Sequence, residues 1–94
     1  MDYSFKKTAK DSLEKLDKSV SREIIETVSE VAEKGFNHDK VKMIKDRNGD
    51  WIYRIKVVRE YTNHRIFADY VEGELKILDI LHRNKAYEYQ YGNG

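Results

Sequence analysis

The stretch from Trp51 to Val58 constrains the fold more than any other part of the sequence, because it alternates in the manner of an extended strand. One face of this strand carries Trp51, Tyr53, Ile55 and Val57. The other face carries Ile52, Arg54, Lys56 and Val58. The Asn48-Gly49 pair before it is the strongest short turn signal in the chain. We therefore expect a hairpin strand whose first set packs under helices, while Arg54 and Lys56 lie side by side on an open face.

Three further segments have strand patterns, and they are Val41–Ile44, His64–Tyr70 and Leu75–Leu81. The last is the most apolar and should be central in a sheet. Glu72-Gly73 indicates a turn, whereas the connection Arg59–Asn63 contains no glycine and its conformation cannot be read from the residues. Short alternating segments at Tyr3–Phe5 and Tyr87–Tyr91 predict an edge strand and a short final strand.

The N-terminal part of the chain predicts two helices joined as an antiparallel hairpin. The first spans Thr8–Asp17 with Thr8 as its N-cap, and the second follows Ser19 and ends at Gly35. An apolar stripe runs along the second helix through Val20, Ile24, Ile25, Val28, Val31 and Ala32. One side of the same helix carries Glu23, Glu26, Glu30 and Glu33. We interpret these glutamates as a solvated helix face rather than as an acidic docking surface for a basic partner.

These elements predict an α+β fold in a single domain, residues 1–94. No apolar run approaches the ~18 to 20 residues of a membrane helix, and the first residues lack the order of a signal peptide. There is no cysteine, which excludes a disulfide framework. Because the three histidines are far apart in sequence, we expect no metal site and no cofactor. A cytoplasmic protein without membrane contact is the expectation.

Charge points to a local basic patch rather than to a basic protein. Lysine and arginine number 18 against 17 acidic residues, so an extended nucleic-acid footprint is absent. Four cations lie on or at the ends of the predicted strands, and they are Arg54, Lys56, Arg65 and Arg83. His82 immediately precedes Arg83, and Tyr87 follows Arg83 by four residues. No carboxylate pair, catalytic serine or glycine-rich phosphate loop is persuasive.

Such a cluster suits phosphate chemistry. An arginine fork matches two phosphate oxygens, and preorganised cations stabilise a phosphorane by about 3 kcal/mol or more per group. His82 could move protons near neutral pH, whereas Tyr87 could do so only if cations lowered its pKa. The plainer alternatives stay open: Arg54 and Lys56 as ordinary strand residues, Arg65 paired with Asp69 or Asp79, and His82 as a strand-end histidine.

Four motifs in order resemble the RelE/ParE superfamily of toxins from toxin–antitoxin pairs, over about residues 2 to 90. They are the opening segment Phe5–Leu16, the strand Trp51–Val57, the strand Arg65–Phe67 and the closing segment Leu78–Tyr87. The resemblance implies a microbial-RNase-like fold, with a helical hairpin on one face of a four-stranded antiparallel sheet. The segment Val58–His64 is longer than in the family's pattern and lacks its usual glycine.

For function, the resemblance implies a ribosome-dependent, metal-independent endoribonuclease that cuts messenger RNA and is silenced by a cognate antitoxin. Carried over to this sequence, the catalytic residues would be Lys56, Arg65, His82, Arg83 and Tyr87. Arg54 and Lys85 would contact RNA. ParE-type members instead inhibit DNA gyrase without cleaving RNA, and an attenuated toxin that only binds its antitoxin is the third alternative. The RelE-like nuclease is the first hypothesis, although the near-neutral charge is low for a ribosome-binding toxin and adds weight to the alternatives.

Overall fold

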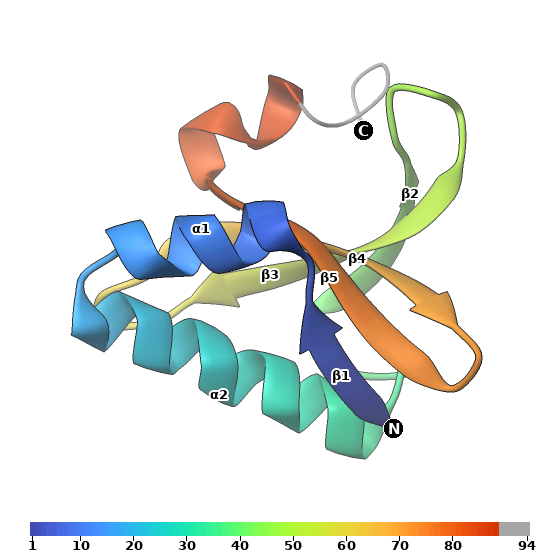
Figure 1. The fold of residues 1–94 in the computed structure, drawn as a ribbon, viewed down its shortest axis with the longest axis horizontal. Helices are drawn as coiled ribbons and strands as arrows, with labels where there is room; N and C mark the ends of the chain where they lie inside the picture. Colours follow the sequence, from blue (N-terminus) through green and yellow to red (C-terminus); the bar gives the residue numbers. More distant parts are fainter. Residues whose placement is uncertain (89–94) are drawn as a thin grey trace.

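The computed structural model describes residues 1–88, which form two α-helices, a five-stranded sheet and a short 3₁₀ helix (Figure 1). In chain order the elements are β1 (Asp2–Phe5), α1 (Lys7–Lys15), α2 (Lys18–Lys34), β2 (Val41–Lys45), β3 (Trp51–Val58), β4 (Asn63–Val71), β5 (Glu74–His82) and η1 (Arg83–Glu88). The strands lie in the order β1-β5-β4-β3-β2. No helix within residues 1–88 is both long enough and apolar enough to cross a membrane.

The α+β class is confirmed, but the sheet has five strands rather than four, and one pairing is parallel. The segment Asp2–Phe5 adds as β1 to the edge of β5, while β2 to β5 form the expected antiparallel part. β5 is therefore an interior strand, and β4 is the middle one. The final strand predicted at Tyr87–Tyr91 is wrong at its start, because η1 includes Tyr87. Residues 89–91 lie outside the described part.

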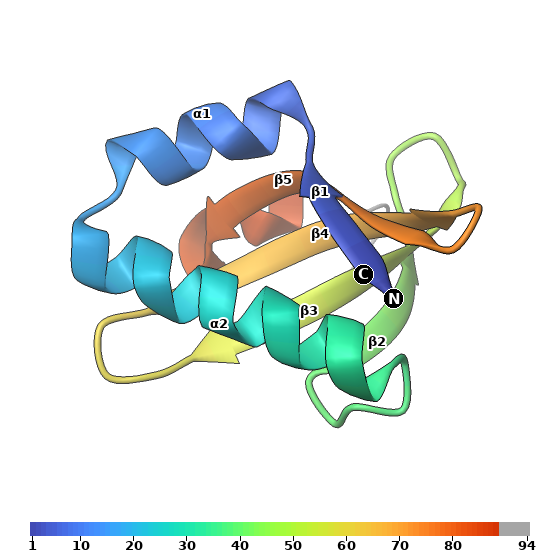
Figure 2. The same cartoon turned by 60° about the horizontal axis from the view of Figure 1, so that its bottom comes forward.

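Both helices cover the same face of the sheet, which we call the helix face (Figure 2). Apolar residues spaced along α2 meet the inward-facing residues of β3, β4 and β5, since both periodicities direct one side of each element to the core. The buried residues of this core are Ala9, Ile24, Val28, Val31, Ile55, Val57, Ile66, Ala68, Leu75, Ile77 and Ile80. The helical hairpin predicted from the apolar stripes is thus present.

The helix ends agree with the sequence only at the C-terminus of α2. Gly35 ends this helix with φ 83°, and its amide donates to the carbonyl of Val31 at 2.7 Å. At the N-termini the predicted caps are wrong, because Thr8 lies inside α1 and Ser19 lies inside α2. Neither helix has a side-chain cap at its N-terminus.

The side chains of β3 alternate between its two faces as predicted, but the environment of one residue on each face differs from the prediction. Ile55 and Val57 are buried on the helix face, but Trp51 is 59% exposed because the β2–β3 hairpin extends beyond the helices (Figure 1). The opposite face, which we call the outer face, is not open along its whole length. Ile52 is buried there with Phe67 and Ala86 of η1. A second small core therefore lies on the outer face under η1.

The connection between β3 and β4 is a short hairpin loop that donates hydrogen bonds to a residue of α2. Arg59 and Thr62 exchange backbone hydrogen bonds of 2.8 and 3.3 Å, which leaves Glu60 and Tyr61 at the tip. Within residues 1–88, Glu72 is the one non-glycine residue with positive φ, so this loop lacks the primed turn that favours two-residue hairpins.

Glu23 supplies the missing support for this loop. A carboxylate oxygen of Glu23 accepts the Tyr61 amide at 3.0 Å and the Thr62 hydroxyl at 2.6 Å, and its carbonyl accepts from Arg59 at 3.2 Å. The interpretation of Glu23 as a solvated residue is wrong, since only 8% of it is exposed. The other three glutamates of that set are exposed. Glu23 thus fixes the start of β4 relative to β3.

Candidate functional site

The register of the sheet brings cations together on the outer face. Lys56 pairs with Arg65 across β3 and β4, and Lys42 pairs with Arg54 across β2 and β3. Directly opposed residues of antiparallel strands share a face, and so do residues two apart along one strand. The four outer-face cations are therefore Lys42, Arg54, Lys56 and Arg65. Sequence reasoning missed Lys42, although the hairpin register around Asn48-Gly49 would have placed it opposite Arg54.

The pairing of Lys56 with Arg65 creates an anion-binding geometry. Opposed Cβ atoms lie about 4.5–5.5 Å apart, so both side chains can reach one anion, which would offset the repulsion between their like charges. Lys56 is exposed, whereas Arg65 is half-buried and oriented by hydrogen bonds from Nη1 to Asn63 Oδ1 (3.2 Å) and the His64 carbonyl (3.1 Å). The register sets neither Asp69 nor Asp79 opposite Arg65, because their partners are Lys76 and Phe67.

Arg54 adds an unsatisfied donor to the same face. Its side chain is half-buried, and its Nε atom is buried without a hydrogen-bond partner among residues 1–88. A buried donor without a partner costs about 1–3 kcal/mol, so such groups in native proteins call for an explanation. Because Nε is closed to solvent, a bound phosphate would contact other atoms of this guanidinium.

The 3₁₀ helix η1 brings two further cations to the border of the outer face. Ala86 packs with Phe67, Ile52 and Ile44, so η1 lies against this face, on the side of the sheet away from α2 (Figure 1). Arg83 and Lys85 are exposed on η1, directly after the strand in which Leu81 is paired with Arg65. Tyr87 belongs to η1, and its side chain lies outside the described part of the structure.

His82 lies on the other side of the sheet. It pairs with His64, which pairs with the buried helix-face residue Val57, whereas the neighbouring register positions join Leu81, Arg65 and Lys56. The two imidazole rings meet edge to face, with centroids 5.3 Å apart. Nδ1 of His82 accepts the amide of Asn84 at 3.2 Å. Strand alternation therefore separates His82 from the cations that it was expected to join.

His64 should make the protein less stable in mild acid. Burial lowers the pKa of its imidazole, and the nearby charges of His82 and Arg65 lower it further. The unfolded chain then binds a proton near pH 6.5 that the folded chain binds only at lower pH, so stability falls as the pH drops below about 6.5. Urea unfolding at pH 7.5 and 5.5 measures this loss. In His64→Leu the loss should be smaller, because the titrating imidazole is gone. The buried Nδ1 has no hydrogen-bond partner within residues 1–88, so the substitution breaks no bond there; an unchanged loss contradicts the assignment.

Asp79 should affect the pH dependence of stability in the opposite direction, by destabilising the protein as the pH rises. Burial raises the pKa of its carboxyl, although the amide of Ile80 donates to it at 2.8 Å. The folded chain then binds a proton above about pH 3.9 that the unfolded chain has lost, so this group costs stability as the pH rises. Asp79→Asn should raise the thermal midpoint at pH 7, and the gain should shrink towards pH 4. Asp69→Asn is the matched control, since Asp69 makes the same contact with the next amide; an equal gain there contradicts the prediction.

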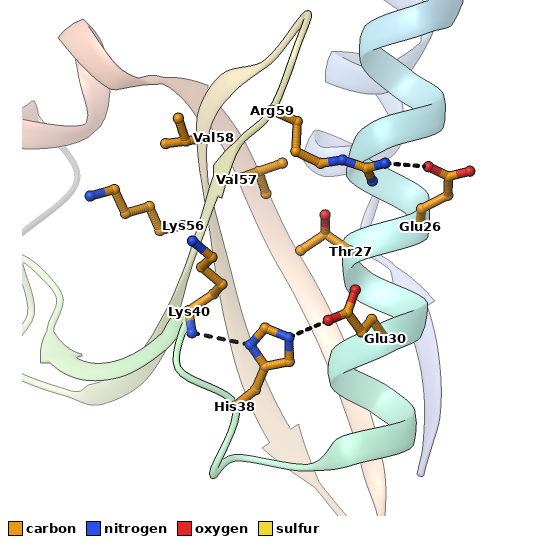
Figure 3. Close-up of a pocket in the computed structure, with 9 residues that line it drawn as sticks. All are labelled: Glu26, Thr27, Glu30, His38, Lys40, Lys56, Val57, Val58 and Arg59. Atoms are coloured by element: carbon orange, nitrogen blue, oxygen red, sulfur yellow. Dashed lines mark hydrogen bonds and ion pairs between the residues drawn. The ribbon is translucent and has the colours of Figure 1, made fainter.

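A cleft of about 400 Å³ separates α2 from the end of β3 (Figure 3). Its lining includes His38, whose Nε2 lies 2.6 Å from Glu30 and whose Nδ1 accepts the Lys40 amide at 3.1 Å. Arg59 pairs with Glu26 at 3.0 Å in the same cleft. The hydrogen bond with His38 is the largest cause that lowers the pKa of Glu30. His38, Glu30, Arg59 and Glu26 are thus engaged with one another. Lys56 also borders this cleft, but its side chain points away from α2 (Figure 3), so we take the outer face as the candidate site.

No three histidine or acidic side chains within residues 1–88 come together as a metal site. The outer face carries cations, which bind and stabilise anions. The arrangement suits recognition of a phosphodiester and stabilisation of negative charge that develops on it.

Comparison with known proteins agrees with this fold. The intact RelBE toxin–antitoxin complex of E. coli contains a chain that matches with a TM-score of 0.63 and 18% identity, over 86% of this chain and 94% of that chain. The RelB–RelE complex of Methanococcus jannaschii contains one that matches with a TM-score of 0.62 and 21% identity, over 89% and 94%. No curated protein sequence matches. The predicted RelE-like fold is thereby confirmed.

The family assignment comes from the sequence itself. Residues 3–87 match the family model described as "ParE toxin of type II toxin-antitoxin system, parDE". This match spans β1 to η1 and includes the outer-face cations, and it confirms the resemblance to the RelE/ParE superfamily. The chain thus belongs to the ParE toxin family of type II toxin–antitoxin systems.

Proposed function

We propose that this toxin inhibits translation by cutting messenger RNA on the ribosome, without a metal ion. The observation that carries the proposal is the direct pairing of Lys56 with Arg65 on the outer face, next to Arg54. These three of the four outer-face cations, bordered by Arg83 and Lys85 of η1, provide the charge that a transition state for phosphodiester cleavage requires.

In this mechanism the ribose 2′-hydroxyl attacks the adjacent phosphorus, and negative charge grows on the phosphorane. Arg65 and Arg83 stabilise that charge through bidentate contacts. Arg54 and Lys56 hold the substrate phosphate and stabilise the alkoxide that forms when the 2′-hydroxyl loses its proton to a water molecule. The P–O5′ bond breaks, which gives a 2′,3′-cyclic phosphate and a free 5′-hydroxyl.

The leaving 5′-oxygen must gain a proton, and we assign its delivery to Tyr87 of η1. Such a role requires cations nearby, because an unperturbed tyrosine has a pKa near about 10. His82 was the other candidate from the sequence, but the register puts it on the helix face, across from His64. We therefore give His82 no part in proton transfer.

A cognate antitoxin is the expected partner. The two similar solved structures are both toxin–antitoxin complexes, which supports the proposal that an antitoxin binds and silences this chain in the cytoplasm. The other partners are the ribosome and its message.

The test is a reconstituted translation reaction with a defined message. Wild-type protein should cut the message at discrete positions only when ribosomes are present, and the upstream fragments should end in a 2′,3′-cyclic phosphate. The Lys56→Ala/Arg65→Ala variant serves as the control for contaminating nucleases. Uncut message on stalled ribosomes, or equal cleavage by the variant, would sink the proposal.

Inhibition of DNA gyrase is the second candidate. Two observations favour it: the matching family model is that of the ParE toxins, and His82 does not join the cations. A gyrase supercoiling assay separates the two functions, because an RNA-cleaving toxin should leave supercoiling unchanged. Loss of supercoiling without message cleavage would support the second candidate.

A further inference from the structure

Among residues 1–86, Trp51 is the most exposed large hydrophobic residue. It is the first residue of β3 and lies on its helix face, directly after the β2–β3 hairpin loop, which projects beyond the helices (Figure 1). Its exposure is 59%, and that of Met43 on the neighbouring strand is 51%. An exposed aromatic ring has a free π-face on which a base can stack, as in proteins that bind single-stranded nucleic acid.

A cation accompanies this indole. Lys45 pairs with Trp51 in the β2–β3 register, and its ammonium lies 5.1 Å from the centre of the ring. Aromatic rings beside cations are the elements with which proteins hold single-stranded nucleic acid: the ring stacks on a base, and the cation contacts a phosphate. A strand of RNA offers both groups in each nucleotide.

The hairpin also connects this ring to the proposed cleavage site. β2 is an edge strand, with Lys42 on the outer face and Lys45 on the helix face. The outer-face cations run from the Lys56–Arg65 pair through Arg54 to Lys42, and they reach the free edge of β2. Lys45 and Trp51 lie at the same edge of the sheet, on its other face.

We propose that the β2–β3 hairpin is a second contact for single-stranded RNA, in which Trp51 stacks on an unpaired base. Lys42 and Lys45 hold the phosphates on either side of the β2 edge. The inference deepens the proposed function and rests on it, since RNA is taken as the ligand of the outer face. It adds a contact away from the cleaved bond, where the hairpin sets the path of the strand.

The chain contains one tryptophan, so its fluorescence comes from the proposed contact residue alone. Stacking of a base on Trp51 should quench its fluorescence when a short, unstructured RNA is added, and anisotropy of a labelled RNA gives the affinity. Trp51→Ala should weaken binding about 5-fold or more, as stacking contributions of about 1–3 kcal/mol per base imply. Trp51→Phe keeps an aromatic ring and should retain most of the affinity, which protects the test if the alanine variant folds poorly.

The salt dependence of RNA affinity distinguishes the contribution of the aromatic ring from that of the cations. Trp51→Ala should leave the slope of log affinity against log salt unchanged, whereas Lys45→Ala should reduce it by about 0.7, the value for one phosphate contact on a single strand. Tyr61→Ala is the matched control, because Tyr61 is equally exposed, at 58%, on the β3–β4 loop far from β2.

The outcomes distinguish this inference from the proposed function. Quenching without message cleavage keeps the RNA contact and rejects the nuclease. Cleavage that persists in Trp51→Ala, with no quenching at any RNA concentration, overturns the RNA contact and leaves the nuclease intact. The contact is also overturned if the indole signal responds to a protein partner but not to RNA.

Discussion

Arg65→Ala and Lys56→Ala are each expected to slow message cleavage on the ribosome by about 10²–10³-fold, the usual loss when one preorganised donor to a developing oxyanion is removed. The expectation follows from the register, which sets these two side chains directly opposite each other on the outer face. Single-turnover cleavage of a ribosome-bound message measures the loss. Substrate binding should change less than the rate, because the charge that these groups stabilise is greatest in the transition state.

The double variant should lose less than the product of the two single effects, since adjacent groups that act on one phosphate are not independent. Arg65→Lys should recover only part of the rate, because lysine keeps the charge but not the planar fork. The matched controls are Lys10→Ala on α1 and Arg22→Ala on α2, both exposed on the helix layer. If these controls slow cleavage as much as the strand variants, the outer face is not the catalytic surface.

The sequence predicted the fold well wherever a periodic pattern met a buried surface. The apolar stripe of α2 and the alternation of β3 identified both layers, because each pattern directs one side of an element inward. Gly35 ended α2 as expected, since its positive φ suits glycine. The edge strand β1 was harder to read: four residues at a sheet edge carry little periodic signal, and their parallel pairing with β5 depends on the helical hairpin between them.

The sequence predicted part of the site. The alternation of side chains between the two faces of a strand explains why the other predictions failed. Arg54, Lys56 and Arg65 share a face because the β3–β4 register pairs Lys56 with Arg65. That register depends on a loop whose residues carry no glycine signal, so the sequence alone could not fix it. His82 follows Leu81 in the same strand and so must face the opposite side. Because His82 is close to the cations in sequence, we expected it to join them, but successive side chains of a strand point to opposite faces of the sheet.

Two other errors came from reading residue types without their surroundings. Trp51 matched the apolar set of β3, but the helices do not extend over the end of this strand, so it is exposed. Glu23 matched a row of helix-surface glutamates, but the β3–β4 loop packs against that position and buries it. In both cases the tertiary contact, and not the local pattern, determined the environment.

Glu23→Ala is expected to destabilise the protein by about 2–4 kcal/mol, because the buried Thr62 hydroxyl and the Tyr61 amide both lose their acceptor at a cost of about 1–3 kcal/mol each. For a domain of this size, such a loss lowers the thermal midpoint by roughly 10–25 °C. Glu23→Gln retains a side-chain oxygen at the same reach and should lose much less. Glu33→Ala is the matched control on the exposed side of α2 and should change stability by less than about 0.5 kcal/mol.

The same substitution should also reduce cleavage beyond the loss of folded protein. Glu23 holds the loop that fixes the start of β4, and Asn63 at that start orients the guanidinium of Arg65. Without the carboxylate, the loop has no favoured turn of its own to maintain the register, so Lys56 and Arg65 should lose their alignment. Cleavage rates corrected for the folded fraction, measured well below the midpoint of each variant, test this coupling. If the corrected rate of Glu23→Ala equals that of the wild type, Glu23 stabilises the fold without positioning the site.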